Sequence, residues 1–428
     1  MFQPGNRAPR RLIPHILWMG CFLAVATTPL GADVPTWNSF RGPGGQGQAT
    51  ARHLPTEWNE TTNVTWKTPV SGRGHSSPVV DAETIWITTA RPDGSALGVV
   101  GLDFGTGKIL HSVTVFRPDD VEEIHSDNTY ASPTPVVANG RVYVHFGRYG
   151  TACLDGRTGE VLWRNDDLVI EHQGGPGSSP VLFEDQLIVT CDGADRQFLA
   201  GLDTATGEIR WKTDRSAPLR TNPITHRAFS TPLLIEYEGT PQLISPGADQ
   251  VHAYDPRTGA ELWHTRYTGF SNVPAPVYAD GVVYVCTGFF SPELWAIRVD
   301  GSGNVTDTHV LWTLKGRVPE TPSPILHEGF VYMVANMGVA ACVNATTGKR
   351  TAVLRLGGNY SASPVSGGGH LYFCGEDGMT RVVRPGPKPR VIASNRLAGG
   401  IFASPASVGN TIIIRTEDAV YRIDSSDE

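Results

Sequence analysis

Four histidines occupy comparable places in the chain, each a short distance before a proline that opens an apolar run. They are His75, His125, His172 and His226. An imidazole near neutral pH can bind a metal ion or donate a hydrogen bond to an anionic ligand. Polar residues at similar places extend the set, so we predict a ligand-binding site formed by His75, His125, Asn128, His172, His226, Arg227 and Glu320.

The chemistry of this site stays open at the level of sequence. Arg73, Arg220 and Arg227 would favour a carboxylate or sulfate group, whereas Asp127 and Glu171 would favour a cation. No HxH or HExxH spacing marks a metal site. None of the Ser and Thr residues that precede these prolines has a clear base and orienting partner in the sequence. Catalytic residues and metal ligands are therefore left unassigned.

A repeat must bring these distant residues together. Steps of the type Ser/Thr-x-Pro or Ser-Pro recur every 40 to 57 residues, at Pro78, Pro135, Pro180, Pro232, Pro276, Pro324, Pro364 and Pro405. That period fits one four-stranded blade of a propeller. We predict an all-β fold, an eight-bladed β-propeller of four-stranded antiparallel blades. Its loops leading into the inner strands, here called the mouth loops, should converge on the central axis and carry the predicted site.

The hydroxyl residues just before these prolines would line the channel: Ser77, Thr134, Ser179, Thr231, Ser323, Ser363 and Ser404. Their expected role is to hold the start of each inner strand by hydrogen bonding.

A second pattern marks the opposite end of each blade. It is Asp-x-x-Thr-Gly-x-x-x-Trp, in which Asp accepts turn N–H groups, Gly takes a positive φ and Trp buries a large area between blades. Full copies are Asp155, Gly159 and Trp163; Asp203, Gly207 and Trp211; and Asp255, Gly259 and Trp263. In partial copies, His111 and Ala352 stand at the Trp position, and the segments after Asp300 and Pro385 depart from the pattern.

This pattern closely resembles the tryptophan-docking motif of pyrroloquinoline quinone (PQQ) propellers. With Trp37-Asn38-Ser39-Phe40-Arg41-Gly42-Pro43, His75-Ser76-Ser77-Pro78 and Asn128-Thr129-Tyr130-Ala131-Ser132, the chain resembles a family of secreted PQQ-repeat (PQQ-binding-like) proteins abundant in planctomycetes and related bacteria. The resemblance implies the propeller fold and attaches no common reaction to it.

The two ends of the chain indicate how the ring closes. Only three strands follow Pro405, whereas Asn63 to Lys67 carries an isolated Trp66. We expect this segment to be the outer strand of the last blade, which leaves no open seam. The predicted organisation is a signal peptide at 1–32, an N-terminal extension outside the ring at 33–62, and the propeller at 63–428.

Residues 1–32 have a basic start, an apolar run and a small-residue end at Leu30-Gly31-Ala32, typical of a signal peptide. We therefore expect a periplasmic or extracellular protein, with no transmembrane segment in the mature chain. Cleavage removes three Arg and no acid from 35 basic and 42 acidic residues, leaving a net charge of −10. That charge argues against nucleic acid as a partner. The five remaining cysteines lie in apolar strand patterns and read as buried small residues, with one pairing left open.

The leading functional hypothesis is a binding or interaction scaffold, monomeric, holding a protein, glycan or small ligand in the mouth without a cofactor. The alternative, implied by the resemblance, is a quinoprotein dehydrogenase that holds PQQ and Ca²⁺, with oxygen ligands from Asp127, Asn128, Glu171 and Glu320. The chain lacks the adjacent Cys-Cys pair found in many such enzymes. A hydrolase or lyase of another kind is the third possibility.

Overall fold

The computed structural model describes residues 1–3, 5, 36–81, 83–218 and 220–425. By its internal contacts the chain divides into two units, 1–34 and 35–428. The predicted signal peptide falls almost wholly outside the described residues. Everything below concerns the second unit. Among the described residues, no helix has the length and hydrophobicity needed to cross a membrane.

The second blade illustrates how sequence becomes structure. Its strands β6 (Val136–Ala138), β7 (Arg141–His145), β8 (Thr151–Asp155) and β9 (Val161–Asn165) pair in sequence order, each antiparallel to the next. Asn139 and Gly140, both at positive φ, form the tight turn between β6 and β7. The middle strands are almost fully buried because neighbouring blades cover both of their faces.

The same arrangement recurs, so the described residues form eight sheets and the predicted eight-bladed propeller is confirmed. Blade 1 comprises β2 (Val79–Asp81), β3 (Thr84–Ala90), β4 (Leu97–Asp103) and β5 (Ile109–Phe116). Blade 3 comprises β10 (Val181–Phe183), β11 (Gln186–Asp192), β12 (Gln197–Asp203) and β13 (Ile209–Asp214). Blade 4 comprises β14 (Leu233–Tyr237), β15 (Thr240–Gly247), β16 (Gln250–Tyr254) and β17 (Glu261–Arg266).

Blade 5 comprises β18 (Val277–Ala279), β19 (Val282–Cys286), β20 (Glu293–Arg298) and β22 (Val310–Lys315). Blade 6 comprises β23 (Ile325–His327), β24 (Phe330–Ala335), β25 (Val339–Asn344) and β26 (Arg350–Arg355). Blade 7 comprises β27 (Val365–Gly367), β28 (His370–Cys374), β29 (Met379–Arg384) and β30 (Arg390–Arg396). Three short 3₁₀ turns complete the elements: η1 (Pro43–Gly45), η2 (Gly147–Tyr149) and η3 (Pro223–Thr225).

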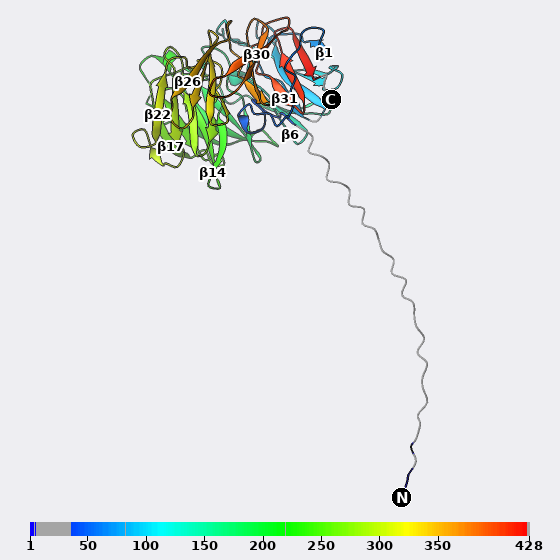
Figure 1. Cartoon of the computed structure of the whole chain (residues 1–428). Coiled ribbons are helices and arrows are strands. Elements are labelled where there is room, and N and C mark those ends of the chain that lie inside the picture. Colours follow the sequence, from blue (N-terminus) through cyan, green and yellow to red (C-terminus); the bar gives the residue numbers. More distant parts are fainter. Residues whose placement is uncertain (4, 6–35, 82, 219, 426–428) are drawn as a thin grey trace. The chain divides into compact units, whose positions relative to one another are not determined.

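The last blade is built from both ends of the chain. Strands β31 (Ala406–Val408), β32 (Thr411–Arg415) and β33 (Ala419–Asp424) are completed by β1 (Val64–Pro69), which pairs antiparallel to β33. In Figure 1 the blue β1 lies beside the red C-terminal strands. The predicted closure is therefore confirmed.

The irregular segment of blade 5 has a structural consequence. Residues Gly303–Asn304 form β21, which pairs parallel to β17 and adds a fifth strand to blade 4. The departure from the turn pattern after Asp300 thus corresponds to an insertion that covers part of the outer edge of the preceding blade.

The tryptophan of one blade lies against the turn of the next. Trp163 Nε1 donates to the carbonyl of Thr204 at 3.0 Å. A Cβ atom at Gly207 (φ 78°) would lie 2.5 Å from the Trp163 ring, so this contact requires glycine. The same close relation holds for the pairs Trp66 and Gly107, Trp211 and Gly259, and Trp312 and Gly348. The His111 ring takes this place against Gly159.

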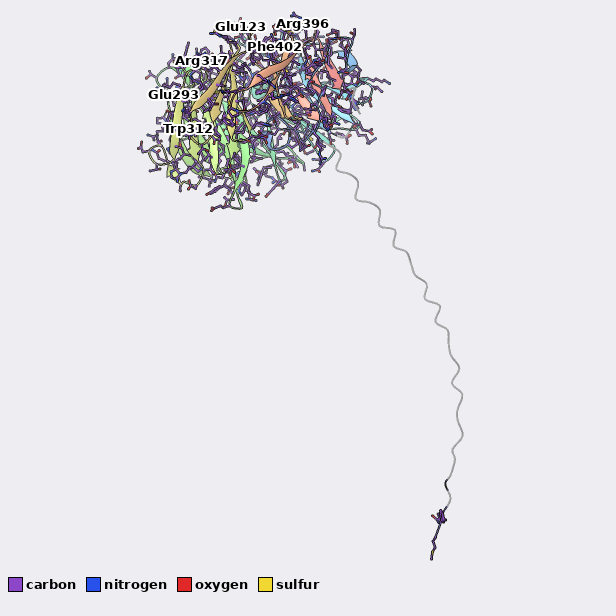
Figure 2. The ribbon with its side chains drawn as sticks, viewed as in Figure 1. Glu123, Glu293, Trp312, Arg317, Arg396 and Phe402 are labelled. Atoms are coloured by element: carbon purple, nitrogen blue, oxygen red, sulfur yellow. The ribbon has the colours of Figure 1, made fainter. Side chains whose placement is uncertain are left out.

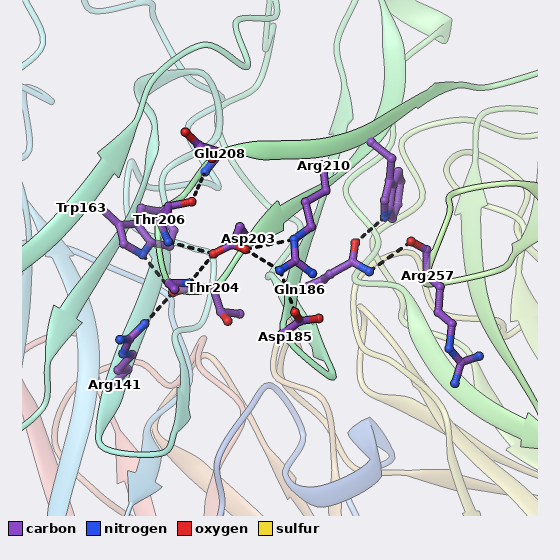
Figure 3. A network of polar contacts seen from close by, with 12 residues as sticks. Arg141, Trp163, Asp185, Gln186, Asp203, Thr204, Thr206, Glu208, Arg210 and Arg257 are labelled. Carbon is purple, nitrogen blue, oxygen red and sulfur yellow. Dashed lines mark hydrogen bonds and ion pairs between the residues drawn. The ribbon is translucent and has the colours of Figure 1, made fainter.

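The polar groups of these turns are already engaged. Asp203 accepts N–H bonds from Ala205 and Thr206 at 2.7 and 2.9 Å, and Arg210 bridges it to Asp185 (Figure 3). Arg141 of the preceding blade donates to the carbonyl of Thr204 at 2.9 Å. This end of the blades therefore offers few free polar groups to a ligand.

The segment before β1 contributes no strand to any blade sheet in the described residues, yet it packs against the ring. Trp37 and Arg41 are each only 1% exposed, and Trp37 joins an apolar cluster formed chiefly by strands of the first and last blades. Main-chain and side-chain hydrogen bonds tie residues 37–49 to inner strands of five blades, at Val80, Val137, Tyr278, Leu326 and Ser366. We call residues 37–49 the channel segment.

All five cysteines within the described residues are free and buried. Burial raises the pKa of the Cys153, Cys286 and Cys374 thiols to about 12. They therefore act as small apolar groups, as the strand patterns predict, and no pair among them is bonded.

Candidate functional site: the mouth cavity

The mouth loops enclose a cavity of about 710 Å³. We call it the mouth cavity. Its lining includes residues from all eight blades, as expected where equivalent loops converge on a propeller axis. In Figure 2 three residues of the mouth loops, Glu123, Arg317 and Phe402, lie along the upper part of the view, and Phe402 belongs to the cavity lining.

A ring of side-chain hydroxyls stands where the inner strands begin. The N–H of Ser77 donates to Thr134 Oγ1 in the next blade at 2.9 Å, and Thr134 N–H donates to Ser179 Oγ at 2.9 Å. Seven such bonds between neighbouring blades, each between 2.9 and 3.1 Å, join the described residues around the axis. We call this the hydroxyl ring; its members are Ser77, Thr134, Ser179, Thr231, Ser323, Ser363 and Ser404, and all of them line the mouth cavity.

The ring has one gap. Pro276 of blade 5 is preceded by Ala275, which has no hydroxyl to accept the N–H of Thr231. Ala275 N–H still donates forward to Ser323 Oγ at 3.0 Å. These hydrogen bonds hold the starts of the inner strands together, which is the role predicted for the Ser and Thr side chains.

His75 lines the cavity next to this ring. Its ring stacks on Phe402 with centroids 4.6 Å apart and planes 6° from parallel. Burial, reinforced by the positive charges of Arg415 and Arg73, lowers the pKa of His75 to about 4. The imidazole is therefore neutral near pH 7 and offers a hydrogen bond rather than a charge.

His125 and Asn128 lie in the mouth loop of blade 2. His125 is exposed, and its Nδ1 lies 3.6 Å from a carboxylate oxygen of Asp127. Asn128 Nδ2 donates to the carbonyls of Gly174 and Pro176, at 2.8 and 3.0 Å, in the next loop. His125 Nδ1 also accepts the N–H of Asp127 at 3.2 Å, which leaves Nε2 for a ligand, whereas Asn128 already fixes two mouth loops to each other.

Arg227 and Glu320 also line the cavity. Arg227 Nε donates to Ser271 Oγ at 3.1 Å, and its Nη1 donates to the carbonyl of Gln173 at 2.5 Å. Glu320 Oε1 accepts the N–H of Phe290 at 3.2 Å. These contacts hold both side chains in place across neighbouring loops.

His172 and His226 are not part of the cavity lining. His172 Nε2 accepts the N–H of Arg148 at 3.1 Å, and burial lowers its pKa to about 3. His226 has its ring nitrogens 2.9 and 2.6 Å from the carbonyl oxygens of Ala194 and Arg220. The structure therefore brings together five of the seven predicted site residues and places these two inside the loops.

A shallower hollow of about 500 Å³ adjoins the mouth cavity and shares His125 and Arg227 with it. Its other lining residues come from the mouth loops of blades 2 to 4: Glu123, Ile124, Gln173, Asn222, Pro223 and Ile224. A ligand larger than the mouth cavity could extend over the loops on this side.

Several lining residues have no signal in the sequence. Phe229, Phe289 and Phe402 supply aromatic surface, and Phe40 reaches the cavity from the channel segment. Met337, 81% exposed, stands in the loop between β24 and β25. The hairpin loops between the second and third strands of the blades also reach the cavity. The site was predicted from the loops before each Pro alone, so these hairpin loops were missed.

The residues present do not fit the PQQ and Ca²⁺ arrangement of the alternative hypothesis. Among the described residues, no three His, Cys, Asp or Glu side chains converge as metal ligands. Of the four proposed oxygen ligands, Glu171 is absent from the cavity lining, and Asn128 Oδ1 accepts bonds from Thr129 and Ser132. We therefore derive no reaction step through PQQ.

Solved structures with the same fold include BamB and an alcohol dehydrogenase. BamB from Moraxella catarrhalis superposes with a TM-score of 0.57 at 16% identity, covering 85% of this chain and 99% of that one. Quinohemoprotein alcohol dehydrogenase from Comamonas testosteroni superposes with a TM-score of 0.64 at 13% identity, covering 91% and 80%. At such identities the likeness concerns the fold alone.

A curated relative is tetrathionate hydrolase of Acidithiobacillus ferrooxidans, 22% identical over 251 residues. The match covers 56% of this chain and about half, 48%, of the relative. The sequence profile PQQ_2, described as outer membrane protein assembly factor BamB, matches residues 48–164, 98–245, 148–373 and 228–428. Because these overlapping matches span nearly the whole ring, the chain belongs to this family of PQQ-repeat β-propellers.

Proposed function

We propose that the protein is a binding scaffold that works outside the cytoplasm and holds its ligand in the mouth cavity. The observation that carries the proposal is the hydroxyl ring, because it fixes the inner strands of neighbouring blades and so builds the cavity before any ligand arrives. A preformed site avoids the entropic cost of ordering loops on binding. The cavity volume, about 710 Å³, is in the range of small-molecule and side-chain sites.

The mixed lining supports recognition rather than one fixed reaction. Aromatic rings at Phe229, Phe289 and Phe402 stand beside cationic and amide groups, a combination suited to a ligand with both apolar and polar parts. BamB, one of the structural neighbours, is by its name an assembly factor, which favours a protein partner. Tetrathionate hydrolase is by its name an enzyme, so a small anionic ligand is the second class to test.

The experiment compares ligand capture by wild type and a mouth variant, His125→Ala/Arg227→Ala. The control is His53→Ala/Arg157→Ala, which removes one exposed His and one exposed Arg outside the cavity lining. Immobilised proteins are probed with periplasmic extract, an oligosaccharide array and a panel of small anions. We expect a ligand that binds wild type and the control and binds the mouth variant at least tenfold more weakly. Equal binding to all three proteins would move the site away from the mouth.

A further inference from the structure

The hydroxyl ring leaves protons directed to no acceptor. A Ser or Thr hydroxyl has one proton to donate and two lone pairs. In the ring, one lone pair is taken by the N–H from the preceding blade, and Ser363 Oγ donates to Ser323 Oγ at 3.0 Å. For the other six hydroxyls no acceptor is found among the described residues: Ser77, Thr134, Ser179, Thr231, Ser323 and Ser404. These side chains are all at least 92% buried and line the cavity. Their O–H groups can therefore donate hydrogen bonds to a ligand in the cavity.

Two buried guanidinium groups flank the ring without a carboxylate partner in the described residues. Arg415 Nη1 donates to the carbonyl and hydroxyl of Ser76, next to the ring member Ser77, and to the carbonyl of Thr88. Its residue is 3% exposed. All of these partners are uncharged, so the positive charge of Arg415 is not neutralised locally.

Arg41 of the channel segment occupies a similar position on blade 6. Its Nη2 donates to the carbonyls of Gln46 and Pro324, at 3.0 and 2.6 Å, and Pro324 follows the ring member Ser323. Its Nε and Nη1 are buried with no hydrogen-bond partner in the described part of the chain. A buried, unneutralised cation is costly unless an anion lies close by.

The acidic groups of the cavity stand in a different place. Asp127, Glu320 and Glu376 belong to loops above the ring. Glu320 accepts the N–H of Phe290, and Glu376 accepts the hydroxyl of Ser361 at 2.5 Å. Asp127 is 86% exposed. Arg415 and Arg41 do not line the cavity themselves; they lie behind the hydroxyl ring, which does line it, and the acids of the lining are confined to the loops.

We propose that the floor of the mouth cavity is an oxyanion site, in which a sulfate, sulfonate or carboxylate group accepts hydrogen bonds from the hydroxyl ring and is stabilised by the charges of Arg415 and Arg41. Several convergent hydroxyl donors with buried positive charges behind them favour an anion over a neutral group. This inference rests on the proposed function and narrows its ligand class: the ligand carries an anionic oxygen-bearing group that reaches the axis.

Two isosteric or near-isosteric variants, Thr134→Val and Ser179→Ala, each remove one ring hydroxyl. The matched control is Ser178→Ala, which removes an equally buried hydroxyl that donates to the carbonyl of Ser230. Calorimetric titrations use sulfate, acetate and glucose, with sodium chloride keeping ionic strength constant. Because sulfate also stabilises folded proteins without binding, the readout is a saturable heat, with circular dichroism confirming that each variant is folded.

We expect saturable binding of sulfate or acetate to wild type and to Ser178→Ala, and binding at least tenfold weaker to Thr134→Val and Ser179→Ala. The oxyanion site would be overturned by an absence of saturable binding of either anion to wild type, by glucose binding as well as the anions do, or by unchanged affinity in whichever ring variant folds. The proposed function could still hold in that case. The capture experiment changes His125 and Arg227 in the mouth loops, whereas this experiment changes the hydroxyl ring at the floor.

Discussion

The main-chain N–H of Ser404 donates to Ser77 Oγ at 3.1 Å, across 327 residues of sequence. This bond joins the last blade to the first at the axis, while β1 joins them at the outer edge through β33. The ring is therefore closed twice, once by a sheet and once by a side chain. The inner closure also shapes the floor of the mouth cavity, so the same residues serve the stability of the ring and line the proposed binding site.

Filling the gap in the hydroxyl ring should stabilise the protein. Ala275→Thr would supply an acceptor for the N–H of Thr231, and we expect the free energy of unfolding to rise by about 1 kcal/mol relative to Ala275→Val. The two variants have nearly the same shape, so their difference isolates the hydroxyl. Denaturant unfolding of both proteins measures it. If the valine variant proves as stable as the threonine variant, the gap does not leave an unsatisfied N–H.

The glycine of the turn should matter for the contact it allows as well as for its φ. Gly207→Ala would place a methyl group 2.5 Å from the Trp163 ring, whereas Gly140→Ala, at φ 72°, meets nothing within 4 Å. We expect the Gly140 variant to lose about 1–2 kcal/mol for its left-handed backbone, and the Gly207 variant to lose roughly 1–3 kcal/mol more from overpacking. Thermal unfolding of both variants gives the comparison. Equal losses would mean that the Trp163 ring moves away at little cost.

The sequence predicted the ring well because each blade repeats the same physical problem. A proline opens the inner strand, an Asp-Thr-Gly turn reverses the chain, and a tryptophan covers the next turn. Even the irregular blade 5 was visible, although the fifth strand β21 was not, because pairing at the outer edge depends on tertiary neighbours.

The candidate site was predicted less completely. Loop position brought His75 and His125 to the cavity, but it could not say which way a loop side chain turns. His172 and His226 point inward, where backbone groups pair with His172 Nε2 and with both ring nitrogens of His226. Phe40 belongs to no repeat, so only the folded channel segment could bring it to the mouth.

The channel segment should behave as part of the core. Trp37 is 1% exposed and packs chiefly with strands of the first and last blades, so we expect Trp37→Ala to lower the free energy of unfolding by about 3–5 kcal/mol. The control is Thr61→Ala, at an exposed position of the same N-terminal region. Chemical denaturation of the chain from residue 33 onward tests both. A loss under about 1 kcal/mol, typical of a surface change, would show that the segment only lies on the ring.

Buried histidines should make the stability of the fold fall as the pH is lowered from about 6.5 to 4. Burial lowers the pKa of His145 to about 4, while an unfolded imidazole titrates near 6.5. Between these values the unfolded chain binds more protons than the folded one, so the free energy of unfolding falls as the pH is lowered from 6.5 to 4. At about 1.4 kcal/mol per pKa unit, His145 alone accounts for roughly 3 kcal/mol at pH 4.

The turn carboxylates of Asp103, Asp155 and Asp203 titrate below this window, because hydrogen bonds lower their pKa. His145→Asn keeps a polar partner for Thr151, whose Oγ1 lies 2.8 Å from His145 Nδ1, and removes the titrating group. Urea unfolding at pH 4, 5, 6 and 7 should give a shallower pH dependence for this variant than for wild type, and parallel curves would contradict the assignment.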